Sequence, residues 1–241
     1  MNKIMSCFSI KIFLIHVLLC CNIYLFSQDT TFNKYGLWVI SSVDVYKKTI
    51  SKDPQKIMVA LSVEMPEAIV DLKYACTDNF MHKKLYPPVT TTYLRLAASD
   101  ALFSVLAELR SKHMTIKIWD AYRPYAVTEE MWERVKDDRY AADPKSGSGH
   151  NRGIAVDLTI VDLNTNKELD MGTGFDNFSD SAHQDFKNLP GNVLQNRTLL
   201  RSLMEKHGFK ALETEWWHYY LPDTTKYELL DLGFDELYKT L

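Results

Sequence analysis

The sequence predicts a single α+β domain, because helical and strand-like segments are interspersed along it without regular βαβ units. Its 241 residues are enough for one domain with a substantial core. Hydrophobic residues make up 46% and charged residues 24% of the chain, an ordinary globular composition. The formal net charge of -3 provides no basic field, so no nucleic-acid partner is expected.

The first 27 residues predict an export signal. Lys3 and Lys11 lie before and at the start of an apolar run, IFLIHVLLCCNIYLF. A basic start followed by such a run is typical of a secretory signal, with cleavage after Ser27. A buried helix and a retained membrane anchor are the alternatives, and lipidation at Cys20 or Cys21 fits poorly because no small-residue lipobox precedes either.

After removal of residues 1–27, we expect an exported protein in the periplasm, without a membrane span. If residues 1–27 are not an export signal, the expected location is the cytoplasm. Of the four cysteines, only Cys76 lies beyond this segment. A single cysteine cannot form an internal disulfide, so stability comes from the core. The sequence does not predict an oligomeric state.

A helix, a strand and a second helix are expected between residues 95 and 135. The first helix is predicted by apolar residues at helical spacing, namely Leu102, Val105, Leu106 and Leu109. Alternation in TIKIW (115–119) predicts a strand, and DAYRP (120–124) ends it because a proline disfavours helix in the residue before it. AVTEEMWERV (126–135) predicts a short helix with acids in its early turns.

The following elements are a loop, a strand, a second loop, a helix and an extended segment. Proline and glycine place a loop over 140–152, and GIAVDLTIV (153–161) reads as a strand. Residues 171–183 are loop-like, and 196–208 form an amphipathic pattern that predicts a helix. The aromatic-rich residues 209–221 are expected to be extended.

Asp157 is the unusual residue of the strand predicted at 153–161. One strand face is apolar, and the other carries Asp157 between Ala155 and Thr159. A carboxylate there is costly unless a cation or a hydrogen-bond donor meets it. His150 lies in a glycine-flanked loop able to turn back toward Asp157, and the two residue types can bind one divalent cation. The alternative is a hydrogen-bonded strand aspartate and a solvated loop histidine.

The segment ETEWWHYY adds a second histidine and a second carboxylate. A hydrolytic zinc site often has three protein ligands and an open water position, which His150, Asp157 and His218 would supply. Glu215 would remain as a base for the water. Residues i and i+3 of an ideal strand point to opposite faces, so a bulge or a turn has to bring Glu215 and His218 together.

Arg123 is a candidate for stabilising negative charge. An arginine beside a metal would meet the oxyanion that develops during amide hydrolysis. The alternative is a surface arginine in a turn.

Two motifs, Ser148-x-His150-x-x-Gly153-x-Ala155-x-Asp157 and Glu215-Trp216-Trp217-His218, together resemble those of the zinc D-alanyl-D-alanine dipeptidases of the VanX type. Other blocks similar to that family, in its order, are DLKYACTDNF (71–80), IWDAYRP (118–124), RGIAVDLTI (152–160), MGTGFD (171–176) and SLMEKHGFKALETEWWHY (202–219). The resemblance extends from about Val70 to Tyr220. It implies a compact α+β domain with a central antiparallel sheet flanked by helices.

The resemblance also implies a role for each matching residue. His150, Asp157 and His218 match the ligands of one zinc ion per chain. Glu215 matches the catalytic base and Arg123 the residue that stabilises the transition state.

Three further positions match the family's substrate pocket. Asp176 matches the acid that holds the free amino group of a small D,D-dipeptide, while Tyr74 and Ser148 match positions that line the pocket. The reaction implied is zinc-dependent hydrolysis of D-Ala-D-Ala to two D-Ala. A zinc D,D-carboxypeptidase acting on peptidoglycan stem peptides and a non-catalytic zinc-containing wall-binding module are the alternatives.

The chain is therefore divided into four parts. They are an export signal (1–27), an N-terminal extension (28–69), the catalytic domain (70–221) and a C-terminal tail (222–241).

Overall fold

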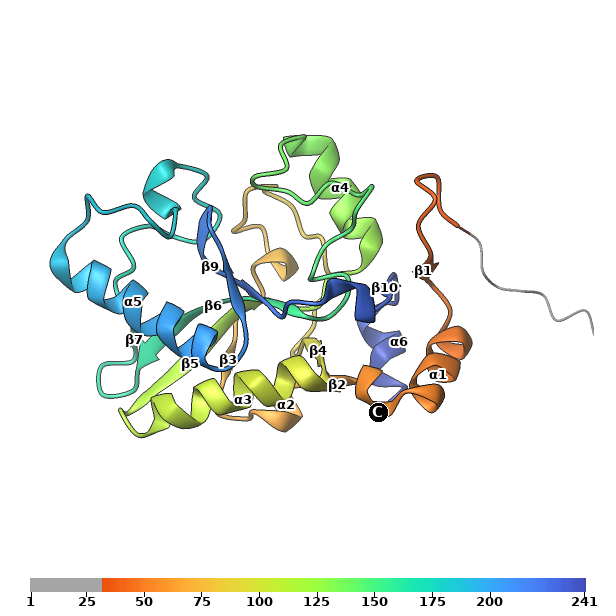
Figure 1. Cartoon of the computed structure of the whole chain (residues 1–241), viewed down its shortest axis with the longest axis horizontal. Helices are drawn as coiled ribbons and strands as arrows, with labels where there is room; N and C mark the ends of the chain where they lie inside the picture. Colours follow the sequence, from red (N-terminus) through yellow and green to blue (C-terminus); the bar gives the residue numbers. More distant parts are fainter. Residues whose placement is uncertain (1–31) are drawn as a thin grey trace, which may run out of the picture.

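A six-stranded sheet runs through the middle of the molecule (Figure 1), in a computed structural model that describes residues 32–241. The predicted export signal lies outside these residues. The strand order is β3-β5-β6-β9-β8, with β7 also paired to β6. The strands are β3 (Ile69–Val70), β5 (Met114–Asp120), β6 (Ala155–Asp162), β7 (Lys167–Glu168), β8 (Lys210–Leu212) and β9 (Glu215–Tyr220). All pairs are antiparallel except β3 with β5, which confirms the predicted central antiparallel sheet.

Two helices cover one face of this sheet. The α3 helix (Leu96–Arg110) buries the four predicted apolar residues, and α5 (Gly191–Lys206) lies beside it (Figure 1). They pack on the apolar face of the central strands, where Ile118 and Leu158 belong to the same core. The opposite face carries Asp157 and is left to loops and to α4 (Tyr125–Val135), which was predicted one residue shorter.

The α5 helix begins five residues before the predicted start. Pro190 provides the residue before the first turn, and the helix continues through the polar stretch that follows. Of the first turn only Val193 is buried, so the other positions need not be apolar and the stretch shows no regular apolar pattern. Periodicity therefore located the middle of the helix and missed its beginning.

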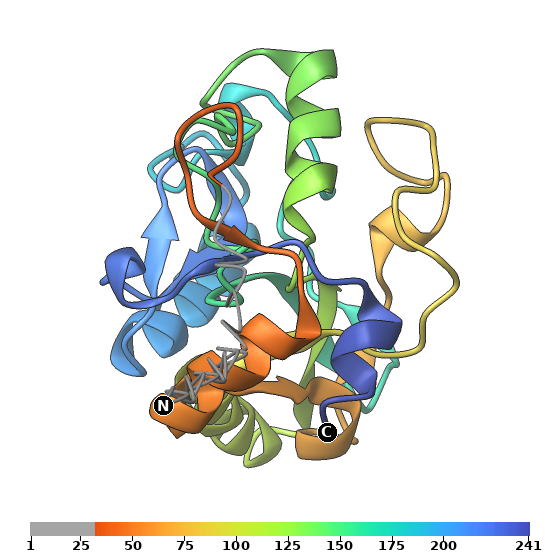
Figure 2. The same cartoon turned by 90° about the vertical axis from the view of Figure 1, so that its right-hand side faces the viewer.

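Segments from both ends of the chain share a second apolar core. The α1 helix (Val43–Lys52) and α6 (Phe234–Tyr238) lie side by side (Figure 2), and β1 (Val39–Ile40) pairs in parallel with β10 (Leu229–Leu230). The aromatic residues of this core include Tyr46, Tyr93, Tyr122 and Phe234. Residues on both sides of the predicted boundaries at 70 and 221 thus pack together.

Shorter elements complete the fold. They are β2 (Met58–Ala60), which pairs with β4 (Tyr93–Arg95), α2 (Leu61–Glu64), and the 3-10 turns at Pro54–Lys56, Lys73–Ala75, Asp180–Ala182 and Thr224–Lys226. Within the described part of the chain, no helix has both the length and the apolar character needed to cross a membrane.

Arg95 anchors the loop that enters β6. Its fully buried guanidinium donates hydrogen bonds to the carbonyls of Lys56, Arg152 (3.0 Å) and Glu228 (3.2 Å). The backbone N–H of Arg95 also donates to the carbonyl of Gly153, at 2.7 Å. One side chain thereby joins β4, the C-terminal segment and the loop that carries His150.

Candidate active site

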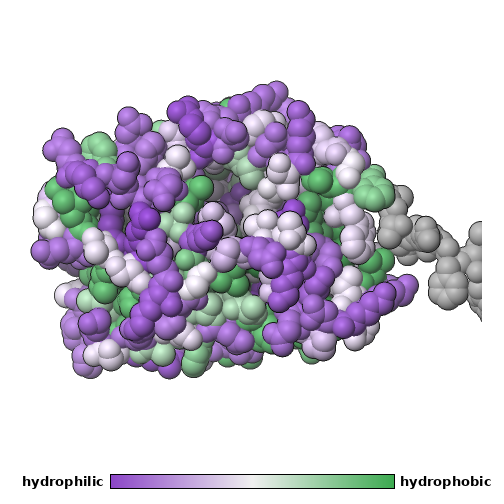
Figure 3. Space-filling view, viewed as in Figure 1, coloured by the Kyte–Doolittle hydropathy of each residue, from purple (hydrophilic) through white to green (hydrophobic). Residues whose placement is uncertain are grey.

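The structure brings all eight predicted site residues to one cavity of about 240 Å³. Figure 3 shows a hollow on this face of the molecule, between β9 and α4. The residues come from six separate parts of the chain and are Tyr74, Arg123, Ser148, His150, Asp157, Asp176, Glu215 and His218.

A bulge in β9 brings Glu215 and His218 to the same side. Ala211 of β8 pairs with Tyr219, but the next residue, Leu212, pairs with Glu215, so three residues of β9 have no partner in β8. The extra residues bend the strand, and a Glu215 carboxylate oxygen lies 3.9 Å from Nδ1 of His218. This is the irregularity that the i, i+3 spacing requires.

His150, Asp157 and His218 place three metal-ligating atoms together. Nε2 of His150 lies 3.2 Å from Nδ1 of His218, and the Asp157 carboxylate lies 3.4 Å from the first and 2.9 Å from the second. Asp157 and His218 are direct neighbours across β6 and β9, so the sheet register sets their separation. All three atoms lie within 4.8 Å of one another.

A hydrogen bond orients the imidazole of His150. Its Nδ1 lies 2.6 Å from the carbonyl oxygen of Ala121, which can only accept, so the proton is on Nδ1 and the lone pair is on Nε2. Gly153 makes the tight loop possible, since its φ is +69° and a Cβ there would lie 2.6 Å from the side chain of Met58.

The spacing of these three atoms fits a zinc ion. Ligand atoms at about 2.0–2.1 Å from a tetrahedral zinc lie about 3.3 Å apart, close to the separations found here. Two imidazole nitrogens and one carboxylate oxygen are ligand types that zinc accepts. The carbonyl of Ala121 supplies the outer hydrogen bond that metal-ligating histidines usually have.

The charges around the three atoms perturb one another. Burial alone would raise the pKa of Asp157, but the two histidines outweigh it and hold this pKa well below its usual range. Burial lowers the pKa of His218 despite the nearby Asp157 carboxylate, which favours the neutral imidazole that binds metals. Burial, followed by repulsion from Asp157 and Asp176, raises the pKa of Glu215 well above its usual range.

Asp120 holds Arg123 in the wall of the cavity, and it is a residue of the candidate site that the sequence reasoning missed. Two guanidinium nitrogens donate to one Asp120 oxygen at 2.7 and 3.0 Å, and the hydroxyl of Tyr86 donates to the other at 2.7 Å. Burial opposes the charge of Arg123, but Asp120 raises its pKa well above the usual value. The sequence signal that could have revealed this contact is the spacing of three between Asp120 and Arg123 in DAYRP.

Asp176 lines the same cavity as the three ligand residues, in a left-handed turn with a φ of 57°. Its carboxylate accepts hydrogen bonds from the hydroxyl of Tyr74 at 3.0 Å and from the backbone N–H of Phe80 at 3.4 Å. Burial raises the pKa of Asp176 to about 7, although the hydrogen bond from Tyr74 opposes this shift.

Ser148 supports the loop from within. Its hydroxyl oxygen accepts a hydrogen bond from the backbone N–H of His150 at 3.1 Å, and its own N–H donates to the side chain of Asn151 at 2.9 Å. The residue therefore fixes the turn into His150 as well as lining the cavity.

Comparison with known proteins agrees with this geometry. The profile of a family described as D-ala-D-ala dipeptidase (Peptidase_M15) matches residues 55–236. The chain is 36% identical over 173 residues to a D-alanyl-D-alanine dipeptidase of Escherichia coli. The aligned region covers 72% of this chain and 89% of that protein. The identity to the enzyme of the same name from Enterococcus faecium is 30% over 175 residues, covering 64% and 85% of the two chains. The identity to a D-alanyl-D-alanine dipeptidase of Streptomyces coelicolor is 33% over 181 residues, and the aligned region covers 64% of this chain and 88% of that protein. The chain therefore belongs to the D-Ala-D-Ala dipeptidase family, Peptidase_M15.

Proposed function

We propose that this protein hydrolyses the dipeptide D-Ala-D-Ala to two D-Ala, with one zinc ion held by His150, Asp157 and His218. The observation that carries the proposal is the convergence of these three ligand atoms with Glu215 and Arg123 in one cavity. Membership of the dipeptidase family supports the same substrate. When bound, a zinc ion at these residues activates water and polarises the scissile carbonyl.

Glu215 is the proton carrier in this proposal. Its carboxylate is buried beside His218, so it can accept a proton from water and deliver it to the amine that leaves as the peptide bond breaks. Burial is the main reason that the pKa of Glu215 is raised, and repulsion from Asp157 and Asp176 adds to it; a cation at the three ligand residues would offset the repulsion and favour the basic form.

Arg123 is positioned to meet the negative charge that develops on the carbonyl oxygen. Asp120 already orients its guanidinium, so little reorganisation is needed during the reaction. The guanidinium also lies 5.1 Å from the centre of the Tyr74 ring, which limits its movement on the other side.

Asp176 is proposed to bind the amino group of the dipeptide. Its half-buried carboxylate lines the cavity, and a substrate ammonium group offers both a charge and several N–H donors. Acylation of the amino group removes this charge, so a free dipeptide is preferred over an acylated one.

Replacing Glu215 with glutamine tests the proposal. The variant Glu215→Gln keeps its size but cannot accept the proton, so the rate of D-Ala release should fall by about 10²–10⁴-fold. Zinc content, measured by atomic absorption, should remain near one per chain in both proteins. Loss of zinc from the variant would instead make Glu215 a metal ligand and contradict the role given to it.

A further inference from the structure

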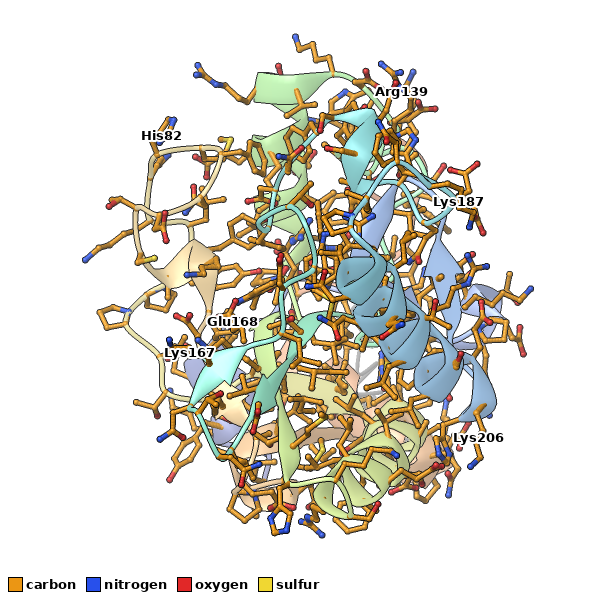
Figure 4. The ribbon with its side chains drawn as sticks, turned by 90° about the vertical axis from the view of Figure 1, so that its left-hand side faces the viewer. His82, Arg139, Lys167, Glu168, Lys187 and Lys206 are labelled. Carbon is orange, nitrogen blue, oxygen red and sulfur yellow. The ribbon has the colours of Figure 1, made fainter. Side chains whose placement is uncertain are left out.

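A second and larger cavity adjoins the catalytic one. Its volume is about 650 Å³, and its floor is the same sheet face that carries Asp157, continued by Thr159 and Trp119. Figure 4 shows His82 and Glu168 on the same side of the molecule, on two segments that line this cavity, while Arg139 of the catalytic cavity lies elsewhere. Of the eight predicted site residues only Asp176 lines this space, and the proposed reaction has no other use for it.

Two buried polar atoms on the cavity floor have no hydrogen-bond partner among the described residues. They are Nε1 of Trp119, a residue only 4% exposed, and Oγ1 of Thr159, which is 1% exposed. Both atoms are enclosed by the protein, so an occupant of the cavity would lie against the surrounding side-chain surface and not on these two atoms. Trp216, in contrast, donates its indole N–H to the hydroxyl of Thr173 at 2.8 Å.

The charges around the second cavity select against an anionic occupant. Four carboxylates line it; Asp78 is paired with Lys73 and Glu168 with Lys117, whereas Asp170 and Asp176 have no ion-pair partner among the described residues. A ligand carboxylate would meet repulsion here, whereas an uncharged amide carbonyl would not. An uncharged peptide backbone therefore fits this lining better than an anionic group does.

Two residues separate this space from the catalytic cavity. Phe80 and Asp176, which we call the partition, are the residues that line both cavities. The ring of Phe80 packs against Tyr74 and Phe178 at centroid distances of 6.1 and 5.3 Å, and its backbone N–H donates to Asp176. The partition thus stands at the end of the catalytic cavity where the proposed function places the amino group of the substrate.

We infer that Phe80 sets the length of the substrate, and that the second cavity takes the residues preceding D-Ala-D-Ala in a longer peptide once the Phe80 ring is removed. This inference rests on the proposed function. The ring closes the catalytic cavity at the amino end of the dipeptide, and the amide N–H of a longer peptide still gives Asp176 one donor. The added residues then lie against Trp119 and Thr159, which line the second cavity.

The test compares D-Ala-D-Ala with N-acetylglycyl-D-Ala-D-Ala as substrates of the zinc-loaded protein. The variant Phe80→Ala should raise kcat/KM for the longer peptide at least about tenfold over the parent. Phe178→Ala is the matched control, because it removes a ring that touches Phe80 and leaves the partition in place; it should give no such gain. Thermal melting shows whether each variant is folded. If Phe80→Ala does not fold, Phe80→Leu replaces it in the same comparison.

Binding separates a failure of this inference from a failure of the proposed function. Calorimetry with the zinc-free Phe80→Ala protein should show the longer peptide binding at least about tenfold more tightly than to the parent, whether or not D-Ala-D-Ala is a substrate. Equal binding and equal cleavage of the longer peptide by parent and variant would overturn the role of Phe80.

Discussion

At the scale of single residues, Asp176 shows how the backbone positions a charge. Its left-handed φ of 57° turns the side chain toward Tyr74, and such a conformation costs energy in a residue other than glycine. Aspartate tolerates it better than most residues. Besides this backbone strain, the charged form of the carboxylate costs free energy in the folded protein, because burial raises the pKa of this carboxyl to about 7.

The raised pKa predicts a pH-dependent effect of Asp176→Asn on stability. An acid whose pKa is higher in the folded state than in the unfolded state destabilises the fold above the folded pKa, and this cost disappears as the pH falls toward the unfolded pKa. In zinc-free protein, the variant should therefore unfold at higher urea concentration than the parent at pH 8, with a smaller difference at pH 5. A difference that grows on acidification would contradict the assignment.

Asp120 makes a second prediction at this scale. Asp120→Asn keeps the shape of the side chain but removes the charge that orients Arg123, so kcat should fall roughly 10–100-fold, as for other outer-shell contacts, with little change in KM. Asp231→Asn is the control. Asp231 is likewise a hydrogen-bond acceptor, here for the backbone N–H of Ala126, but it lies outside the cavity. Similar losses in both variants would show that Asp120 acts on stability alone.

At the scale of elements, the bulge in β9 marks the limit of what the sequence could predict. The composition of 209–221 indicated an extended segment, and the spacing of Glu215 and His218 required an irregularity within it. The position of the bulge follows from the pairing of Leu212 with Glu215, which no local pattern reveals. The α1 helix was also missed, because few of its ten residues are apolar and only Tyr46 is buried, although the apolar residues do follow helical spacing.

The C-terminal elements give a prediction about packing. Phe234 is 3% exposed, and its ring contacts those of Tyr86, Tyr93 and Tyr122. Phe234→Ala should lower the free energy of unfolding by about 3–5 kcal/mol, the usual cost of a buried phenylalanine. Tyr238→Ala, in the same helix but 68% exposed, should change it by less than about 0.5 kcal/mol. Equal effects in urea unfolding would mean that the tail is not part of the folded core.

At the scale of the whole molecule, the chemistry was more predictable than the architecture. The motifs from 148 to 157 and from 215 to 218 each carry residues that need one another chemically, so their convergence in one cavity could be expected. The second cavity could not be expected, because the segments that line it are far apart in the sequence and meet only in the fold. The same holds for the pairing of β1 with β10, which joins residues about 190 positions apart.

The central claim is that a metal ion at His150, Asp157 and His218 supports hydrolysis of a free D,D-dipeptide. Its most direct test measures D-Ala released from D-Ala-D-Ala by the purified protein as isolated, after chelation, and after zinc is restored, with an N-acylated peptide ending in D-Ala-D-Ala in parallel. We predict release from the dipeptide that stops on chelation and returns with zinc, and little release from the acylated peptide. Cleavage unaffected by chelation, or absent from a protein shown to hold zinc, would contradict the account.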